Sequence, residues 1–194
     1  MLSQLQEIFA PPQLYWRIVA HAARKLRSEY LPEEERQRKA YGLLGGRLFV
    51  DRAEVTHVFP LVHNRRDDPR LKPWVDEILE EHAVPSETSL SRRGWVTDPR
   101  EVLAAERECE MDGSILLGGY HMHRVPWAGD PDRDTCTAVD TRLADGSGLW
   151  MFILSMVDPE RPRLRAFFEG RNDKEVPLRL GEYSTRGLSG WGLE

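Results

Sequence analysis

Two histidines separated by one residue, His121 and His123, close an apolar stretch over residues 114–120. Side chains alternate between the two faces of a β-strand, so both imidazoles should project from one face, close enough to bind one ion. Downstream, Thr137 and Asp140 add a hydroxyl and a carboxylate. Two imidazoles, one carboxylate and an open fourth position are typical of a catalytic zinc site rather than a closed structural one. We therefore expect His121, His123 and Asp140 to bind zinc.

Length and composition limit the classes of protein to consider. A chain of 194 residues is long enough for one buried core and short for two. A net charge of −5 argues against a nucleic-acid binder, which presents a basic face. Apolar runs are too short to span a bilayer, and residues 1–4 do not resemble the start of a secretory signal. With two cysteines, a reduced cytoplasmic protein without nucleic-acid or membrane partners is expected.

Hydrophobic periodicity predicts the elements in the first half of the chain. Apolar residues recur every four positions and indicate an amphipathic helix over about 13–30. Segments 41–50 and 54–61 are expected to form a strand and its hairpin partner. Residues 71–82 are compatible with a short helix.

The second half carries the elements that position the histidine pair. A helix is expected from Asp98 to about Asp112, because Asp98 and the following proline are good helix starters and Gly113 ends it. The histidine strand over 115–123 follows, and Thr137 is expected to cap a short helix. Further strands are expected over 150–157, 164–169 and 175–180.

These elements predict an α/β (α+β) fold, with a mixed sheet flanked by helices in three layers and the histidine strand near its centre. The expected organisation is an N-terminal extension over 1–13 and a single domain over 14–183. A flexible, glycine-rich tail over 184–194 is expected to follow the domain.

Around the histidine pair, the sequence resembles the JAB/MPN (JAMM) family of zinc metalloproteases, particularly its small bacterial members. The family signature is His-x-His-x7-Ser-x2-Asp, preceded by Glu-x2-Gly-x3-Gly. His121 and His123 match the histidine pair, Thr137 and Asp140 match the Ser-x2-Asp, and the segment 42–46 supplies the two glycines. The resemblance extends over the element order from about residue 14 to 170.

The resemblance implies a JAB/MPN-like (cytidine-deaminase-like) domain in which His121, His123 and Asp140 hold zinc and a water occupies the fourth position. It also implies that an upstream glutamate carries the proton of that water to the leaving amine. The Thr137 hydroxyl would help to stabilise the oxyanion. Family substrates include isopeptide bonds to ubiquitin-like modifiers and C-terminal adducts of sulfur-carrier proteins, so a peptide or a ubiquitin-like protein is the implied partner.

The spacing between the histidines and the carboxylate departs from the family pattern. Thirteen residues separate His123 from Thr137, where the signature has seven. Asp134 therefore competes with Asp140, since it stands at the family interval from His123, with Pro131 at the serine position. We favour Asp140, because Thr137 can cap a helix that turns Asp140 inward, whereas Asp134 lacks a partner hydroxyl in register.

The second departure concerns the catalytic base. Lys39 occupies the position three residues before Gly42 where the family has glutamate. Glu35 lies about one helical turn upstream and is the candidate replacement. Three functions remain open: a zinc-dependent metallopeptidase or isopeptidase, a non-hydrolytic zinc-binding scaffold or binding module, and a hydrolase of a non-peptide amide. We favour an enzyme, since a scaffold has little physical reason to keep an open zinc site.

Overall fold

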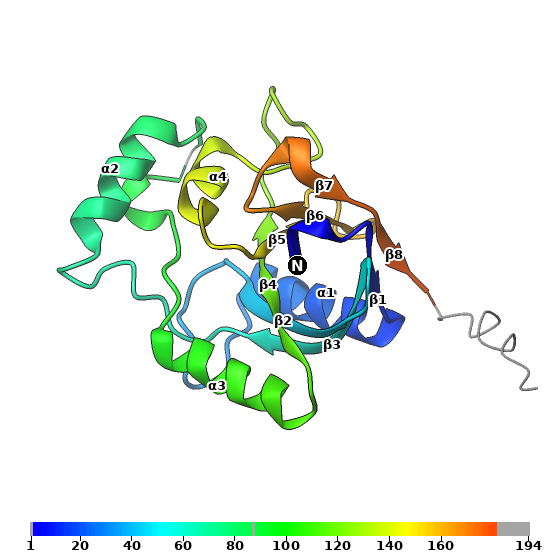
Figure 1. Cartoon of the computed structure of the whole chain (residues 1–194). Coiled ribbons are helices and arrows are strands. Elements are labelled where there is room, and N and C mark those ends of the chain that lie inside the picture. The colour runs from blue at the N-terminus through cyan, green and yellow to red at the C-terminus, as the bar shows by residue number, and fades with distance from the viewer. Residues whose placement is uncertain (1, 87, 182–194) are drawn as a thin grey trace, which may run out of the picture.

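The structure, a computed structural model, describes residues 2–86 and 88–181. Within them it is a mixed α+β fold with four α-helices and an eight-stranded mixed sheet that curves into a nearly closed barrel (Figure 1). The elements in chain order are β1 (Glu7–Ala10), α1 (Pro12–Leu26), β2 (Tyr41–Leu48), β3 (Arg52–Pro60), α2 (Lys72–His82), α3 (Pro99–Met111), β4 (Ile115–His123), α4 (Ala138–Ala144), β5 (Trp150–Ser155), β6 (Arg163–Phe168), β7 (Glu175–Val176) and β8 (Leu178–Leu180), with 3-10 turns at Leu2–Gln4, Leu90–Arg92 and Asn172–Lys174.

The strand order is β7-β6-β5-β4-β2-β3-β1-β8, so β4 lies at the centre, as expected. The β4–β5, β1–β3 and β1–β8 pairs are parallel, and the other neighbouring pairs are antiparallel. The two outer strands, β7 and β8, are separated in the chain by Pro177 alone. Proline has no N–H to donate to a ladder, which favours a break between the two short strands. Pro177 thus connects the two ends of the curved sheet directly.

Two expectations about the chain ends need correction. The segment 1–13 was expected to precede the domain, but β1 lies within it and pairs with β3 and β8 in the same sheet. Residues 175–180 were expected to form one strand and instead supply both outer strands. The tail over 184–194 lies outside the described residues. In the part of the chain that is described, no helix is long and apolar enough to cross a membrane.

The two faces of the sheet carry different helices. Helix α1 packs against the face that holds the main core, which includes Leu44, Tyr120 and Met122. Helix α3 covers part of the other face and packs on β2 and β4, while α2 contacts α4 (Figure 1). On the α1 side, Gly42 lets the ring of Tyr120 lie directly against β2, because a Cβ at that position would overlap the ring. Since side chains alternate along β4, His121 and His123 belong to the face opposite Tyr120 and α1.

Candidate metal centre

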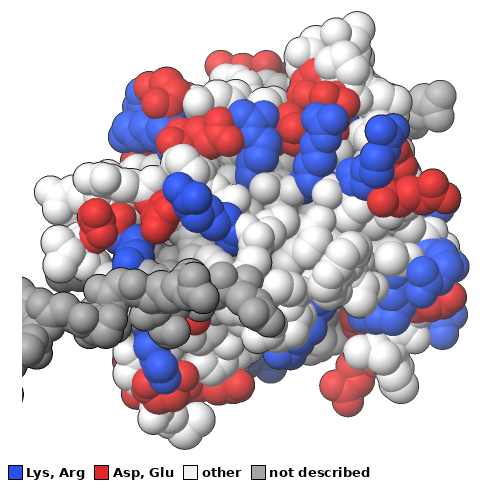
Figure 2. Space-filling model, turned by 90° about the vertical axis from the view of Figure 1, so that its right-hand side faces the viewer, with Lys and Arg blue, Asp and Glu red and all other residues white. Residues whose placement is uncertain are grey.

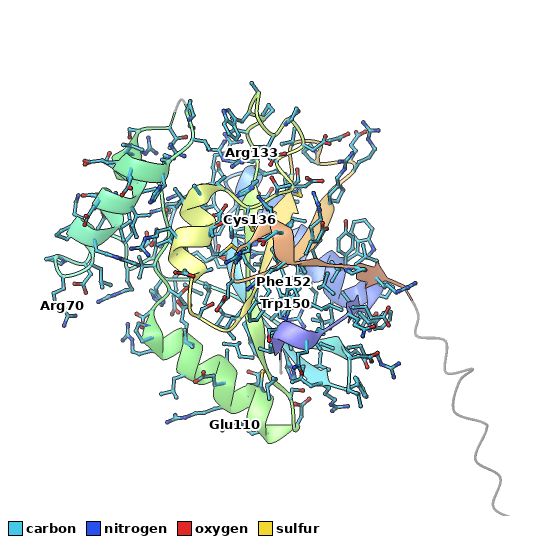
Figure 3. The ribbon with its side chains drawn as sticks, turned by 45° about the horizontal axis from the view of Figure 1, so that its top comes forward. Arg70, Glu110, Arg133, Cys136, Trp150 and Phe152 are labelled. Carbon is cyan, nitrogen blue, oxygen red and sulfur yellow. The ribbon has the colours of Figure 1, made fainter. Side chains whose placement is uncertain are left out.

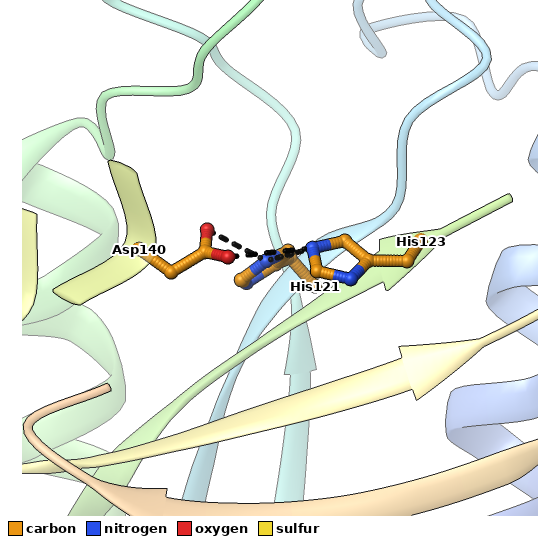
Figure 4. A group of neighbouring side chains, drawn as sticks. All are labelled: His121, His123 and Asp140. Atoms are coloured by element: carbon orange, nitrogen blue, oxygen red, sulfur yellow. Dashed lines mark hydrogen bonds and ion pairs between the residues drawn. The ribbon is translucent and has the colours of Figure 1, made fainter. Parts of the chain in front are cut away.

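His121 and His123, at the end of β4, converge with Asp140, in the first turn of α4 (Figure 4). The two Nε2 atoms lie 3.0 Å apart. Oδ1 of Asp140 lies 3.2 Å from Nε2 of His121, and its Oδ2 lies 3.5 Å from Nε2 of His123. All three residues are buried. The structure thus brings together the three residues that the sequence predicts as metal ligands.

The donor set fits a metal ion. Zinc binds imidazole nitrogen at about 2.0–2.1 Å, and two such ligands at the tetrahedral angle lie about 3.3 Å apart. The nitrogen–nitrogen and nitrogen–oxygen distances of 3.0 and 3.2 Å around His121 are close to this spacing. Three converging donors from two separate elements are therefore arranged as a group that can hold a metal.

Neighbouring groups fix the orientation of each imidazole. Nδ1 of His123 donates to the backbone carbonyl of Arg133 over 3.1 Å, which leaves the Nε2 lone pair directed at the group. The ring of His121 stacks on Tyr41, with centroids 5.2 Å apart, and Tyr41 stacks in turn on Trp95 at 4.8 Å. This stack restrains the plane of His121. Both imidazoles are therefore held by outer contacts that leave Nε2 free for a metal.

Asp140 is held by the residue that begins its helix. Thr137 is the N-cap of α4 and forms a capping box with Asp140. Its backbone N–H and its Oγ1 hydroxyl each donate to Oδ2 of Asp140 over 2.7 Å. The expected helix cap is confirmed. In this structure the Thr137 hydroxyl is engaged with the carboxylate, so Thr137 acts as a positioning residue for Asp140.

The protonation states suit metal binding. Burial would raise the pKa of Asp140, but the neighbouring His121 and His123 imidazoles outweigh burial and hold it well below the usual range. Burial lowers the pKa of His123 and outweighs the opposing effect of Asp140. Asp140 is therefore an anion and His123 is neutral near pH 7, and these are the forms that coordinate a metal.

Asp134, the competing carboxylate, points elsewhere. Its Oδ1 accepts from Arg165 over 2.8 Å, and its Oδ2 accepts from Arg163 over 3.3 Å. Both arginines belong to β6. The additional residues between β4 and α4 are therefore accommodated in a loop that leaves Asp140, rather than Asp134, beside the histidines.

The structure does not bring Glu35 to the histidines. Its segment is not helical, and the backbone of Glu35 is fixed by an N–H bond to Val62 and a carbonyl bond from Lys25. His121, His123 and Asp140, called the metal group below, line a cavity, and the side chain of Glu35 is not part of its lining. Lys39 does line that cavity, and its Nζ donates to the carbonyl of Gly94 over 2.9 Å. Burial, together with the charge of Arg66, lowers the pKa of Lys39 to about 8.

The metal group lies in the wall of a cavity of about 430 Å³. Tyr41, Trp95 and Trp127 also line it. Its cationic lining residues are Arg38, Lys39, Arg93, Arg124 and Arg133. Among the described residues, Asp140 is the one carboxylate in the lining.

Sequence reasoning missed most of this lining because it comes from loops. Arg93 and Trp95 precede α3, and Arg133 lies between β4 and α4 (Figure 3). No periodic pattern marks such positions. Arg124 is the cationic lining residue that the sequence could place near the site, since it directly follows His123.

Comparisons with known proteins show a shared fold. No family model and no curated protein matches the chain. The solution structure of a protein from Desulfitobacterium hafniense is similar, with 24% identity, a TM-score of 0.57, and coverage of 93% of this chain and 97% of that chain. A solution structure from Salinibacter ruber has 23% identity and a TM-score of 0.43 over 85% of this chain and 83% of that chain. At these identities the Desulfitobacterium protein shows that the fold is shared, and no family membership follows from it.

Proposed function

We propose that this chain is a zinc-dependent hydrolase that cleaves a peptide or isopeptide bond. The observation that carries the proposal is the His121–His123–Asp140 group, whose three donors converge in the wall of a cavity large enough for a ligand. When bound there, zinc would polarise the scissile carbonyl and lower the pKa of a water. A closed structural site would instead surround the ion with four protein ligands.

The other residues of the site hold these groups and shape the cavity. Thr137 keeps the carboxylate of Asp140 turned inward, and the Tyr41–Trp95 stack supports His121. These contacts support preorganisation of the metal group before substrate arrives.

The cavity favours the end of a chain as substrate. Its volume is within the range of small-ligand sites, so it suits a flexible tail rather than a folded surface. We therefore propose, as the resemblance implies, a substrate bond at the C-terminal tail of a ubiquitin-like or sulfur-carrier protein.

One observation favours a second candidate, a metal-binding module without hydrolytic activity. Lys39 stands where a glutamate is expected, and within the described chain the cavity has no carboxylate other than Asp140. Among the described residues, the cavity therefore offers no carboxylate that could carry a proton to the leaving amine.

The two functions are separated by assaying zinc-loaded protein against peptide and isopeptide substrates with C-terminal tails. The hydrolase predicts zinc-dependent cleavage that is lost in Asp140→Asn and retained in the matched variant Asp134→Asn. Zinc binding without cleavage of any substrate would support the binding module instead. Zinc content, measured on every sample, distinguishes a lost ion from a lost reaction.

A further inference from the structure

The lining of the cavity differs in charge from the outer surface. On the face shown in Figure 2, Lys and Arg side chains are interspersed with Asp and Glu side chains. Arginines elsewhere pair directly with carboxylates, as Arg165 does with Glu175. Among the described residues, the lining of the cavity instead contains five cations and one carboxylate, that of Asp140, which is already engaged with the histidines. Such a concentration of one charge in a concave site attracts anions.

The cations of the cavity bond largely to neutral groups. Lys39 donates to the carbonyl of Gly94, and Nη1 of Arg93 donates to the carbonyl of Val84 over 2.8 Å. These contacts fix the side chains in place through uncharged acceptors. A cation that is held in position by a carbonyl remains available to an anionic ligand.

Arg133 shows the same feature more strongly. It is 9% exposed, its Nη1 has no hydrogen-bond partner, and its nearest carboxylate oxygen, on Asp130, is 3.9 Å away. Nε1 of Trp95, which lines the same cavity, is also buried without a hydrogen-bond partner. Buried donors are nearly always paired in folded proteins, so these two residues of the cavity lining each keep a donor that no acceptor of the described residues satisfies.

Arg93 and Arg133 both line the cavity. Burial and then the charge of Arg133 lower the pKa of Arg93, while Tyr41 and Asp140 act in the opposite direction. Both arginines therefore add positive charge to the lining that also contains His121, His123 and Asp140. Two like charges at a partly buried site are unfavourable unless an anion lies between them.

We propose that Arg93 and Arg133 form an oxyanion-binding subsite beside the metal group, which receives a carboxylate or phosphate of the ligand. Guanidinium groups match both anions, because their planar donors bind two oxygens at once. Apolar side chains of Leu61, Val139 and Leu143 line the same cavity and suit an apolar portion of that ligand. Only the statement that this ligand is a substrate rests on the proposed hydrolase function.

Anion binding is tested directly on the zinc-loaded full chain by calorimetric titration with inorganic phosphate and, separately, with N-acetylglycine. The anion that binds with the higher affinity shows whether the subsite prefers phosphate or carboxylate. Arg93→Gln and Arg133→Gln should each lower the affinity for that anion by about tenfold to a hundredfold, because each removes a charge-assisted hydrogen bond. The backbone carbonyl that holds His123 is retained in Arg133→Gln, and zinc content is measured to confirm an intact metal group.

Arg70→Gln is the matched control. Arg70 is exposed, pairs with Asp68 and lies far from Arg133 in Figure 3, so its substitution removes the same charge and should leave binding unchanged. The subsite is disproved if neither anion binds the parent, or if Arg70→Gln weakens binding as much as the two cavity variants do.

Hydrolysis separates this inference from the proposed function. Peptides with a free C-terminal carboxylate are compared with their C-terminal amides, with the scissile bond at different distances from the C-terminus. If each pair is cleaved with equal kcat/KM and phosphate does not inhibit, the chain is a hydrolase without this subsite. If anions bind as predicted and no substrate is cleaved, the subsite stands and the hydrolase proposal fails.

Discussion

The hydroxyl of Thr137 donates to Oδ2 of Asp140 over 2.7 Å, so one residue both begins α4 and orients the carboxylate of the metal group. A helix cap is normally a matter of stability. Here the same residue also orients a candidate metal ligand, because its hydroxyl and its backbone N–H both donate to the carboxylate of Asp140. Contacts of this kind around metal ligands tune metal affinity.

Thr137→Val is therefore expected to weaken zinc binding by about tenfold to a hundredfold, since it removes the hydroxyl and keeps the size of the side chain. It should also lower the free energy of unfolding by about 1 kcal/mol through loss of the cap. Competition with a fluorescent zinc chelator measures the first effect, and urea unfolding measures the second. Thr137→Ser keeps the hydroxyl and should resemble the parent. Equal zinc affinities of the valine and serine variants would contradict this role.

Metal binding itself is expected to need His121, His123 and Asp140. The parent should bind about one zinc ion, as a single three-donor group predicts. The double variant His121→Ala, His123→Ala should bind none, and Asp140→Asn should release zinc at a chelator concentration that the parent tolerates. Asp134→Asn should retain zinc, because Asp134 pairs with Arg163 and Arg165. Elemental analysis after dialysis decides the matter, and zinc retained by the double variant would place the site elsewhere.

Lys39, at the position where the family has glutamate, gives a prediction of gain rather than loss. Lys39→Glu introduces a carboxylate into the cavity and, if that carboxylate reaches the attacking water, should raise the rate of cleavage by about two to four orders of magnitude. Glu35→Gln should change the rate little, because the side chain of Glu35 does not line the cavity. Turnover numbers for zinc-loaded protein measure both. A Glu35→Gln variant that binds zinc but has lost all turnover would restore Glu35 as the base.

Acid sensitivity is expected from His21, which contacts the hydroxyl of Tyr120 over 2.8 Å in the core. Burial and then the charge of Lys25 lower its pKa to about 4 from an ordinary value of 6.5. Between these pH values the unfolded chain binds more protons than the folded one, so the free energy of unfolding falls as the pH is lowered through this window. The stabilisation is complete above pH 6.5, and the loss is at most about 3 kcal/mol.

Urea unfolding of the metal-free protein from pH 4.5 to 7.5 measures this loss, and His21→Gln should flatten the curve. Despite its burial, hydrogen bonds from Arg24 and Leu31 hold the pKa of Glu34 at about 2. Glu34 therefore contributes its own pH dependence below about pH 4.5, outside most of the window. Parallel curves for the parent and His21→Gln would show that another group is responsible.

The sequence was sufficient to predict that His121, His123 and Asp140 lie together, because their positions depend on local rules. Alternation along β4 places His121 and His123 on one face, and the cap at Thr137 turns Asp140 inward. The central position of β4 was also predicted, since the apolar run before His121 indicates a buried strand.

Features that depend on distant parts of the chain were not predicted. The four residues of β1 are too few to show a periodic pattern, and they become a strand only because β3 and β8 flank them. Arg93 and Arg133 come from separate loops, so no spacing in the sequence relates them. Glu35 was considered a base from its distance to Lys39 along a helix, and that reasoning failed because the segment is not helical.

The six residues 175–180 that carry β7, Pro177 and β8 protect both margins of the sheet at once. Exposed margins offer unpaired N–H and C=O groups to the strands of other molecules. Detachment of this one short segment would expose the edges of β6 and β1 together. A partly opened molecule would then have two strand edges that can pair with other molecules. The pairing of both edges therefore depends on one segment that lies far along the chain from the candidate metal ligands.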